Sequence, residues 1–207
     1  MTAWLPRAVL LATLTGCAGS QLGAGDRAQL PHSTAPDVRE IEVSQSEVTY
    51  EVTGASSADL RSSIHDHARA TWSDAAAAGM TNVNIGADVK CQEFSDGGAL
   101  REAKLTLSLI VNLPNWPGEK QAPEALQASW GSFIRALRTH EAGHVAIAKR
   151  HAAALREALK SLPPQAACPE LLKSAETLIR RTDAAMSKEQ LGYDASTEHG
   201  ATQGCIL

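Results

Sequence analysis

The chain has 207 residues, a formal net charge of −4 and a sequence pI near 6.0. This length is enough for one domain with a core of its own. The charge balance is slightly acidic and the sequence has no basic stripe, which excludes the usual nucleic-acid-binding proteins, so nucleic acid is not an expected partner. With few aromatic residues, the core must consist mainly of Ala, Leu, Val and Ile.

The first residues predict export. Arg7 precedes a short apolar run, residues 8–13, which is too short to span a bilayer. The run ends in Leu14-Thr15-Gly16-Cys17, which resembles a bacterial lipoprotein signal. The resemblance implies a signal peptide over residues 1–17, cleaved before a lipidated Cys17. Because Ala18 follows, it also implies the periplasmic face of the outer membrane, with membrane contact through the lipid anchor only. An ordinary secretory signal is the alternative, and it too exports the protein.

A sheet is predicted after this signal. Residues 18–37, rich in Gly, Ser, Ala, Gln and Pro, are expected to form a flexible tether to a folded domain over residues 38–207. A short helix should run from Ser56 or Ser57 to about Ala68. Alternating apolar residues predict strands. The segments with this alternation are residues 38–52 (one strand, or two joined at 44–46), 83–89 and 105–113. A turn at residues 95–98 joins the last two into a hairpin.

Two long helices should follow the sheet. Pro123 and Glu124 favour the start of a helical pattern that continues to Leu162, where Pro163-Pro164 stops it. A second helix should begin after Cys168-Pro169 and end near Leu191, with Gly192 as the stop residue. The short connection makes the two helices antiparallel. The predicted fold is therefore α+β, with a small antiparallel sheet followed by two long antiparallel helices.

Export permits disulfides, and three cysteines follow Cys17. We favour a Cys91–Cys168 bond, which would tie the sheet to the start of the last helix. Cys205, close to the end of the sequence, is then the free thiol.

The first long helix contains the sequence His140-Glu141-Ala142-Gly143-His144. Residues four apart lie on one face of a helix, so the two histidines can bind one metal ion. Glu141 is then placed to hold a water molecule that the metal polarises. This pattern predicts a zincin-like active-site helix with Zn2+ as the cofactor. A glycine at position 143 also suggests that substrate or a neighbouring backbone comes close.

A catalytic zinc ion usually has a third protein ligand. His151 lies about 10 Å further along the helix axis than His144, which is beyond the reach of an imidazole. In an antiparallel helix pair, position 140 lies level with roughly position 190. The segment just after the second predicted helix therefore reaches the site. It contains Tyr193, Asp194 and His199.

Residues from about Val48 to Gly200 resemble a bacterial family described as predicted secreted zinc-dependent proteases, which is otherwise of unknown function. The residues that carry the resemblance are Val48-Thr49-Tyr50, Val52-Thr53-Gly54, Leu60, Cys91, the 105–111 strand, Leu113-Pro114-Asn115-Trp116, Trp130, Phe133, Leu137, the segment 140–144, Cys168, Tyr193-Asp194, Thr197 and His199-Gly200. The resemblance implies a metallopeptidase and also singles out His199 as the third ligand.

These observations give one hypothesis and one alternative. In the hypothesis, the protein is an exported lipoprotein and zinc-dependent metallopeptidase that hydrolyses a peptide or protein, cell-wall peptides included. The metal ligands are His140, His144 and His199, and Glu141 is the general base. Tyr193 donates a hydrogen bond to the oxyanion, and Asp194 orients a ligand histidine. The alternative is a non-catalytic envelope lipoprotein with a structural zinc site or a binding role.

Overall fold

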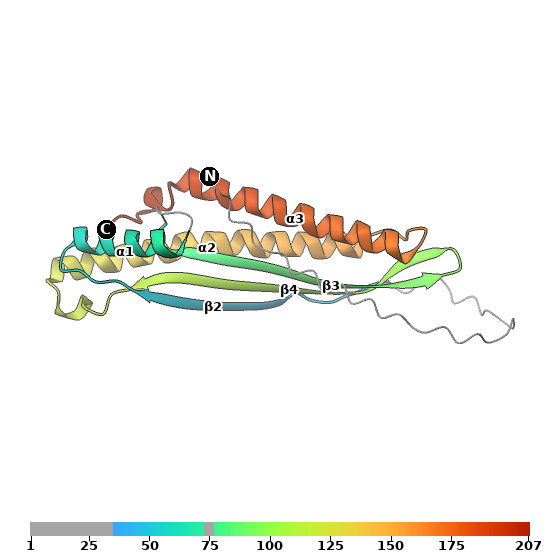
Figure 1. The fold of residues 1–207 in the computed structure, drawn as a ribbon, viewed down its shortest axis with the longest axis horizontal. Helices are drawn as coiled ribbons and strands as arrows, with labels where there is room; N and C mark the ends of the chain where they lie inside the picture. The colour runs from blue at the N-terminus through green and yellow to red at the C-terminus, as the bar shows by residue number, and fades with distance from the viewer. Residues whose placement is uncertain (1–34, 73–76) are drawn as a thin grey trace.

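The computed structural model of the chain describes residues 35–72 and 77–207, which form an elongated α+β domain (Figure 1). The predictions for the signal peptide, for Cys17 and for most of the tether lie outside these residues. In the described ranges, no helix combines the length and the apolar character needed to cross a bilayer.

A long hairpin forms the centre of the sheet. It consists of β3 (Met80–Phe94) and β4 (Gly97–Asn115), which pair antiparallel through a turn at Ser95 and Asp96. From Ala103 to Leu113, every second residue of β4 faces the helices and is buried, which explains its alternating sequence, and a register shift separates Leu100 from this run. The buried apolar residues of that face are Leu100, Ala103, Leu105, Leu107, Leu109, Val111 and Leu113. The predicted hairpin is confirmed, and its strands are longer than the alternation indicated.

The remaining strands correct the prediction of an antiparallel sheet. β1 (Asp37–Val38) and β2 (Glu42–Glu51) both pair parallel to β4, so the sheet is mixed. The reason lies in the connection, because a short helix and β3 lie between β2 and β4 in the sequence and bring the chain back to run in the same direction. The break in the first alternating segment falls at residues 39–41, and β2 runs without interruption through residues 44–46.

The short helix α1 (Ser57–Thr71) begins where the sequence predicted. The hydroxyl of Ser56 accepts a hydrogen bond from the amide of Asp59 at 3.2 Å, which caps the first turn. Leu60, Ile64 and Ala68 form its buried face.

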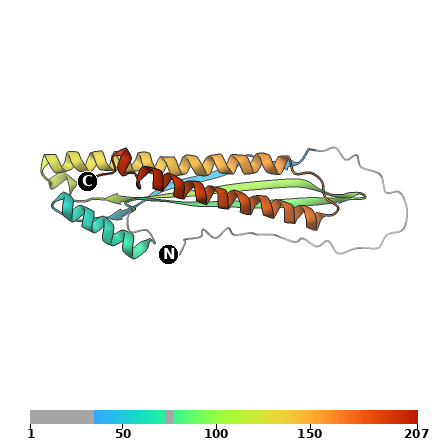
Figure 2. The same cartoon turned by 90° about the horizontal axis from the view of Figure 1, so that it is seen from above.

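The long helices α2 (Glu124–Lys160) and α3 (Cys168–Thr197) run antiparallel and pack on the same face of the sheet (Figures 1 and 2). Short 3-10 helices precede α2 (Glu119–Gln121) and follow α3 (Ala201–Gln203). The apolar residues that α2 buries are Trp130, Phe133, Leu137, Val145, Ile147, Ala148, Ala152, Leu155 and Leu159. The α+β class with two long antiparallel helices is confirmed.

The predicted end of α3 at Gly192 is wrong. The helix continues to Thr197, and Glu198 in the left-handed region ends it. Gly192 lies on the exposed side of the helix, with no side chain to pack there and nothing within 4 Å of a Cβ built on it. A glycine in that place weakens a helix without ending it, and the next turn is held by contacts of Tyr193, Asp194 and Thr197.

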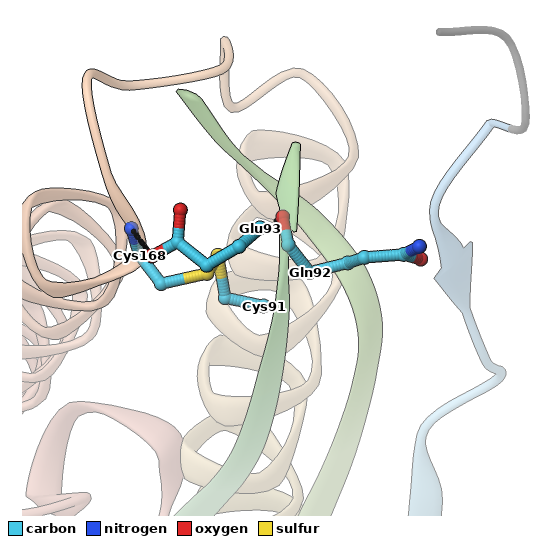
Figure 3. The surroundings of a disulfide bond; sticks show 4 residues. All are labelled: Cys91, Gln92, Glu93 and Cys168. Carbon is cyan, nitrogen blue, oxygen red and sulfur yellow. Dashed lines mark hydrogen bonds between the residues drawn. A yellow bond between two sulfur atoms is a disulfide. The ribbon is translucent and has the colours of Figure 1, made fainter. Parts of the chain in front are cut away.

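The Cys91–Cys168 disulfide is present, and Cys205 is a free thiol, as predicted. The bond joins β3 to the first residue of α3 (Figure 3). Glu93 Oε1 also accepts a hydrogen bond from the Cys168 amide at 2.8 Å. Gly98 and Gln165 exchange two backbone hydrogen bonds of 2.9 Å each, so the α2–α3 loop extends the end of the hairpin.

Candidate metal centre

The buried face of α2 carries three polar side chains among apolar ones. His140, Glu141 and His144 are 3%, 2% and 8% exposed, respectively. The two imidazole rings lie one helical turn apart, with centroids separated by 4.8 Å and planes perpendicular. Burial of such groups costs free energy unless each is hydrogen-bonded or bound to an ion. The partners of these side chains therefore define what the site can hold.

Asp194 on α3 completes a set of three converging ligand atoms. Its Oδ1 lies 3.2 Å from His140 Nε2 and 2.9 Å from His144 Nε2, and the two Nε2 atoms are 3.2 Å apart. Ligand atoms bound at about 2.0–2.1 Å to one tetrahedral zinc ion lie about 3.3 Å apart. These three residues could therefore hold a metal ion with small movements. In residues 35–72 and 77–207, they are the one such group of His, Cys, Asp or Glu.

The sequence assigned the third ligand position to His199, but the group that could hold a metal ion in the structure consists of His140, His144 and Asp194. Because α3 continues past Gly192, Asp194 still lies on the helix and faces α2. His199 follows the end of the helix, has a left-handed backbone with φ 53°, and lines the same cavity as the two motif histidines. Ligation of a metal ion by His199 stays a prediction.

Two glutamines fix the orientation of the histidines. His140 Nδ1 lies 2.9 Å from Gln203 Oε1, and His144 Nδ1 lies 2.5 Å from Gln190 Oε1. An amide oxygen can only accept, so each Nδ1 carries a proton, and each Nε2 faces Asp194, where it can bind a metal ion once it has lost its own proton. Sequence reasoning had given this orienting role to Asp194 and had missed both glutamines. The available signal was the position of Gln190, one helical turn before Asp194.

Tyr193 packs behind the histidines. Its ring stacks on that of His140, with centroids 5.0 Å apart and an interplanar angle of 12°. Its hydroxyl donates to the His140 carbonyl oxygen or to Gln203 Oε1, each at 3.3 Å, and accepts from Gln203 Nε2 at 3.0 Å. A Cβ at position 143 would overlap this hydroxyl, so Tyr193 is the close neighbour that Gly143 indicated. The hydroxyl faces α2, which leaves the predicted oxyanion role without support from the geometry.

The carboxylate of Glu141 lies beside the ligand set and is held from β3. Thr81 Oγ1 donates to Glu141 Oε2 at 2.7 Å. A Cβ at Gly79 would lie 2.6 Å from Glu141 Oε1, so a larger residue there would force the carboxylate to shift. Burial raises the pKa of Glu141, although the Thr81 hydrogen bond and the two nearby histidines oppose that rise.

The charges of the site favour a cation between α2 and α3. Burial disfavours a charged Asp194, but hydrogen bonds from His140 and His144 and the charge of His144 hold its pKa well below the ordinary range. Burial also opposes a charge on His144, yet hydrogen bonds to Asp194 and Gln190 raise its pKa. The two shifts have one physical cause, since the carboxylate attracts positive charge to the point where the three ligand atoms meet.

A cavity of about 210 Å³ opens at this point, between the start of β3, α2 and α3. His140, Glu141, His144, Asp194 and His199 all face it, together with apolar side chains. The ligand atoms are therefore accessible to a small molecule or to part of a chain.

Residues 47–200 match the sequence profile of a bacterial family that is described as "bacterial protein of unknown function (DUF922)". The matched range begins one residue before the resemblance found in the sequence and ends at the same residue. Neither a curated protein nor a solved structure shows a significant match to the chain.

Proposed function

The chain belongs to the DUF922 family of bacterial proteins of unknown function, and we propose that it is a zinc-dependent metallopeptidase. The observation that carries the proposal is the convergence of His140 Nε2, His144 Nε2 and Asp194 Oδ1 beside the carboxylate of Glu141. Two neutral imidazoles and a carboxylate are a ligand set well suited to zinc. The hydrogen bonds from both Nδ1 atoms to glutamines orient the rings so that each Nε2 is the atom that would bind the ion.

The number of ligands supports a catalytic site over the structural alternative. A structural zinc site normally has four protein ligands and is closed, whereas a catalytic site has three and keeps a position open. Here three ligand atoms converge, and the cavity lies on their open side.

The residues around the site suit amide hydrolysis. A zinc ion bound there would polarise a water molecule and the carbonyl group of the substrate. Glu141 accepts a proton from the attacking water and delivers it to the leaving amine. The Thr81 hydroxyl keeps the carboxylate in place during both steps.

The sheet supports a peptide as the substrate. Residues 80–83 at the start of β3 line the cavity, and among the described strands β3 pairs only with β4. Its other edge can therefore form backbone hydrogen bonds with an extended peptide, which would then pass the ligand set. A peptide or protein, cell-wall peptides included, fits this arrangement.

A Glu141→Gln substitution tests the proposal. The amide keeps the size of the side chain but cannot accept the proton, so hydrolysis should fall by about 10²–10⁴-fold. Zinc content, measured by mass spectrometry of the dialysed protein, should not change, because Glu141 is not a ligand. Glu176→Gln is the matched control, since Glu176 lies on α3 and pairs with Arg180 away from the cavity. It should retain full activity.

The readout is cleavage of a mixed peptide library, with and without a zinc chelator. The proposal is wrong if the purified protein holds no zinc, or if a chelator leaves cleavage unaffected. Cleavage that survives Glu141→Gln unchanged would remove Glu141 from its role.

We further propose that the protein is exported and held at the outer membrane by acyl chains on Cys17. The lipoprotein-like sequence at residues 14–17 and the Cys91–Cys168 disulfide, which requires an oxidising compartment, support this proposal. A Cys17→Ser variant should move from the membrane fraction to the soluble fraction and should lose labelling by radioactive palmitate. Equal distribution of both proteins between the two fractions would contradict lipidation.

A further inference from the structure

We infer that the site selects peptides with a large apolar side chain next to the bond that is cut, an inference that rests on the proposed function. The inference is based on the residues that line the cavity away from the metal ligands.

Apolar side chains from three elements form much of the cavity wall there, beside the polar side chains of Thr81, Asn82, Ser187 and Gln190. Leu137 on α2 and Met186 on α3 are 1% and 2% exposed and form its deep part. Met80 and Val83 of β3 also line the cavity. Leu191 lies at the rim and is 70% exposed, which is the highest value among the exposed large hydrophobic residues of the described chain.

Leu191 is placed where a bound side chain would cover it. It precedes Asp194 by three residues, so the two share a face of α3. An exposed leucine gains nothing from folding, but it gains apolar contact when a ligand removes it from water. Its position beside the ligand set makes the substrate the natural source of that contact.

The cavity is large enough for a side chain and, among the described residues, offers no lysine or arginine to an acidic one. Its volume of about 210 Å³ corresponds to roughly seven water molecules in the liquid, so a side chain fits beside the reacting water. No Lys or Arg of the described residues lines it. The acids that do, Glu141 and Asp194, are engaged by Thr81 and by the histidines. An acidic side chain would therefore lose its water without gaining a lysine or arginine partner.

Blocked hexapeptides that differ at one central residue test the inference. Binding is measured by calorimetry on the inactive Glu141→Gln protein, both zinc-loaded and metal-free, and kcat/KM is measured on the wild type. Each buried methylene group contributes roughly a factor of four in affinity. A leucine peptide should therefore bind about ten- to fifty-fold more tightly than its alanine counterpart, and an aspartate peptide should bind more weakly than either.

A Leu191→Asn substitution should reduce the leucine-to-alanine ratio about fivefold, because it removes one apolar wall of the cavity. Leu191 is exposed, so the variant should fold and keep its zinc. Val43→Asn is the control, since Val43 is 49% exposed on β2 and does not line this cavity. It should leave the ratio unchanged.

Equal affinity for leucine, alanine and aspartate peptides would overturn the inference, as would an unchanged ratio in Leu191→Asn. A failure of the proposed function gives a different result, namely no zinc and no cleavage. In that case the calorimetry on the metal-free protein still measures the preference of the cavity, and a flat preference there again overturns the inference.

Discussion

One carboxylate oxygen of Asp194 on α3 contacts both histidines of α2, and this contact leads to a prediction about the third ligand. Asp194→Asn keeps the shape of the side chain but removes its charge. Changes in residues that only orient ligands cost 10–100-fold in metal affinity, so losing a ligand should cost at least about 100-fold. His199→Gln should keep the zinc affinity within a few-fold if Asp194, whose Oδ1 converges with the two histidine nitrogens, is the third ligand. Competition with a fluorescent chelator measures both variants.

The opposite ranking would show that His199 displaces Asp194 when zinc binds. A large loss in both variants would instead indicate four protein ligands and a closed site, which would contradict the catalytic proposal.

Among the site residues, the local sequence pattern predicted only those that lie on one turn of the same helix. The 140–144 segment could be predicted because spacing of four on a helix is a fixed geometry. The choice between Asp194 and His199 depended on where α3 ends. The helix ends five residues later than predicted, so Asp194 lies on the helix and faces α2, whereas His199 follows its end. Thr81, Gln190 and Gln203 were missed because their roles come from tertiary contacts with residues 46 to 63 positions away.

At the scale of the element, two helical glycines differ in their surroundings. Gly192 on α3 has nothing packed against it, whereas Gly143 on α2 leaves the space that Tyr193 fills. Gly192→Ala should raise the free energy of unfolding by about 0.5–1 kcal/mol, because alanine favours a helix and nothing lies within 4 Å of the new methyl group. Gly143→Ala should lower it by about 1–3 kcal/mol, since its Cβ would overlap the Tyr193 hydroxyl. Denaturant unfolding of the metal-free proteins measures both changes.

If Gly192→Ala destabilised the protein, α3 would not be continuous at this residue. If Gly143→Ala were neutral, Tyr193 would not be packed against α2 in solution.

The two glycines also show why element boundaries were predicted less well than elements. Alternation identified β4 correctly, because a half-buried strand imposes a period of two on its own sequence. The direction of β2 relative to β4 could not be predicted in this way, since a strand alternates in the same way in a parallel or an antiparallel pair. The end of α3 was predicted at Gly192, because glycine is the strongest local stop signal. The contacts of the following turn keep the helix going to Thr197.

At the scale of the whole molecule, the disulfide that stabilises the fold and the candidate metal centre lie at opposite ends of α3. The loop between α2 and α3 lies at the end of the hairpin, where the Cys91–Cys168 bond joins helix to sheet (Figures 1 and 3). The metal centre lies near the other end of α3, about 39 Å further along the helix axis at 1.5 Å per residue. Stability and metal binding should therefore respond differently to loss of the disulfide.

A Cys91→Ser, Cys168→Ser double variant tests this separation. The bond closes a loop with a sequence separation of 77 residues, and restriction of the unfolded chain by a loop of this size stabilises a protein by about 4 kcal/mol. The free energy of unfolding should therefore fall by about that amount, measured with denaturant at low temperature. Zinc affinity, measured under conditions where the variant is folded, should stay within a few-fold, because the ligand atoms lie on the buried faces of α2 and α3 far from the bond. A loss of zinc affinity in the folded variant would show that the disulfide sets the position of α3 along α2, and with it the place of Asp194.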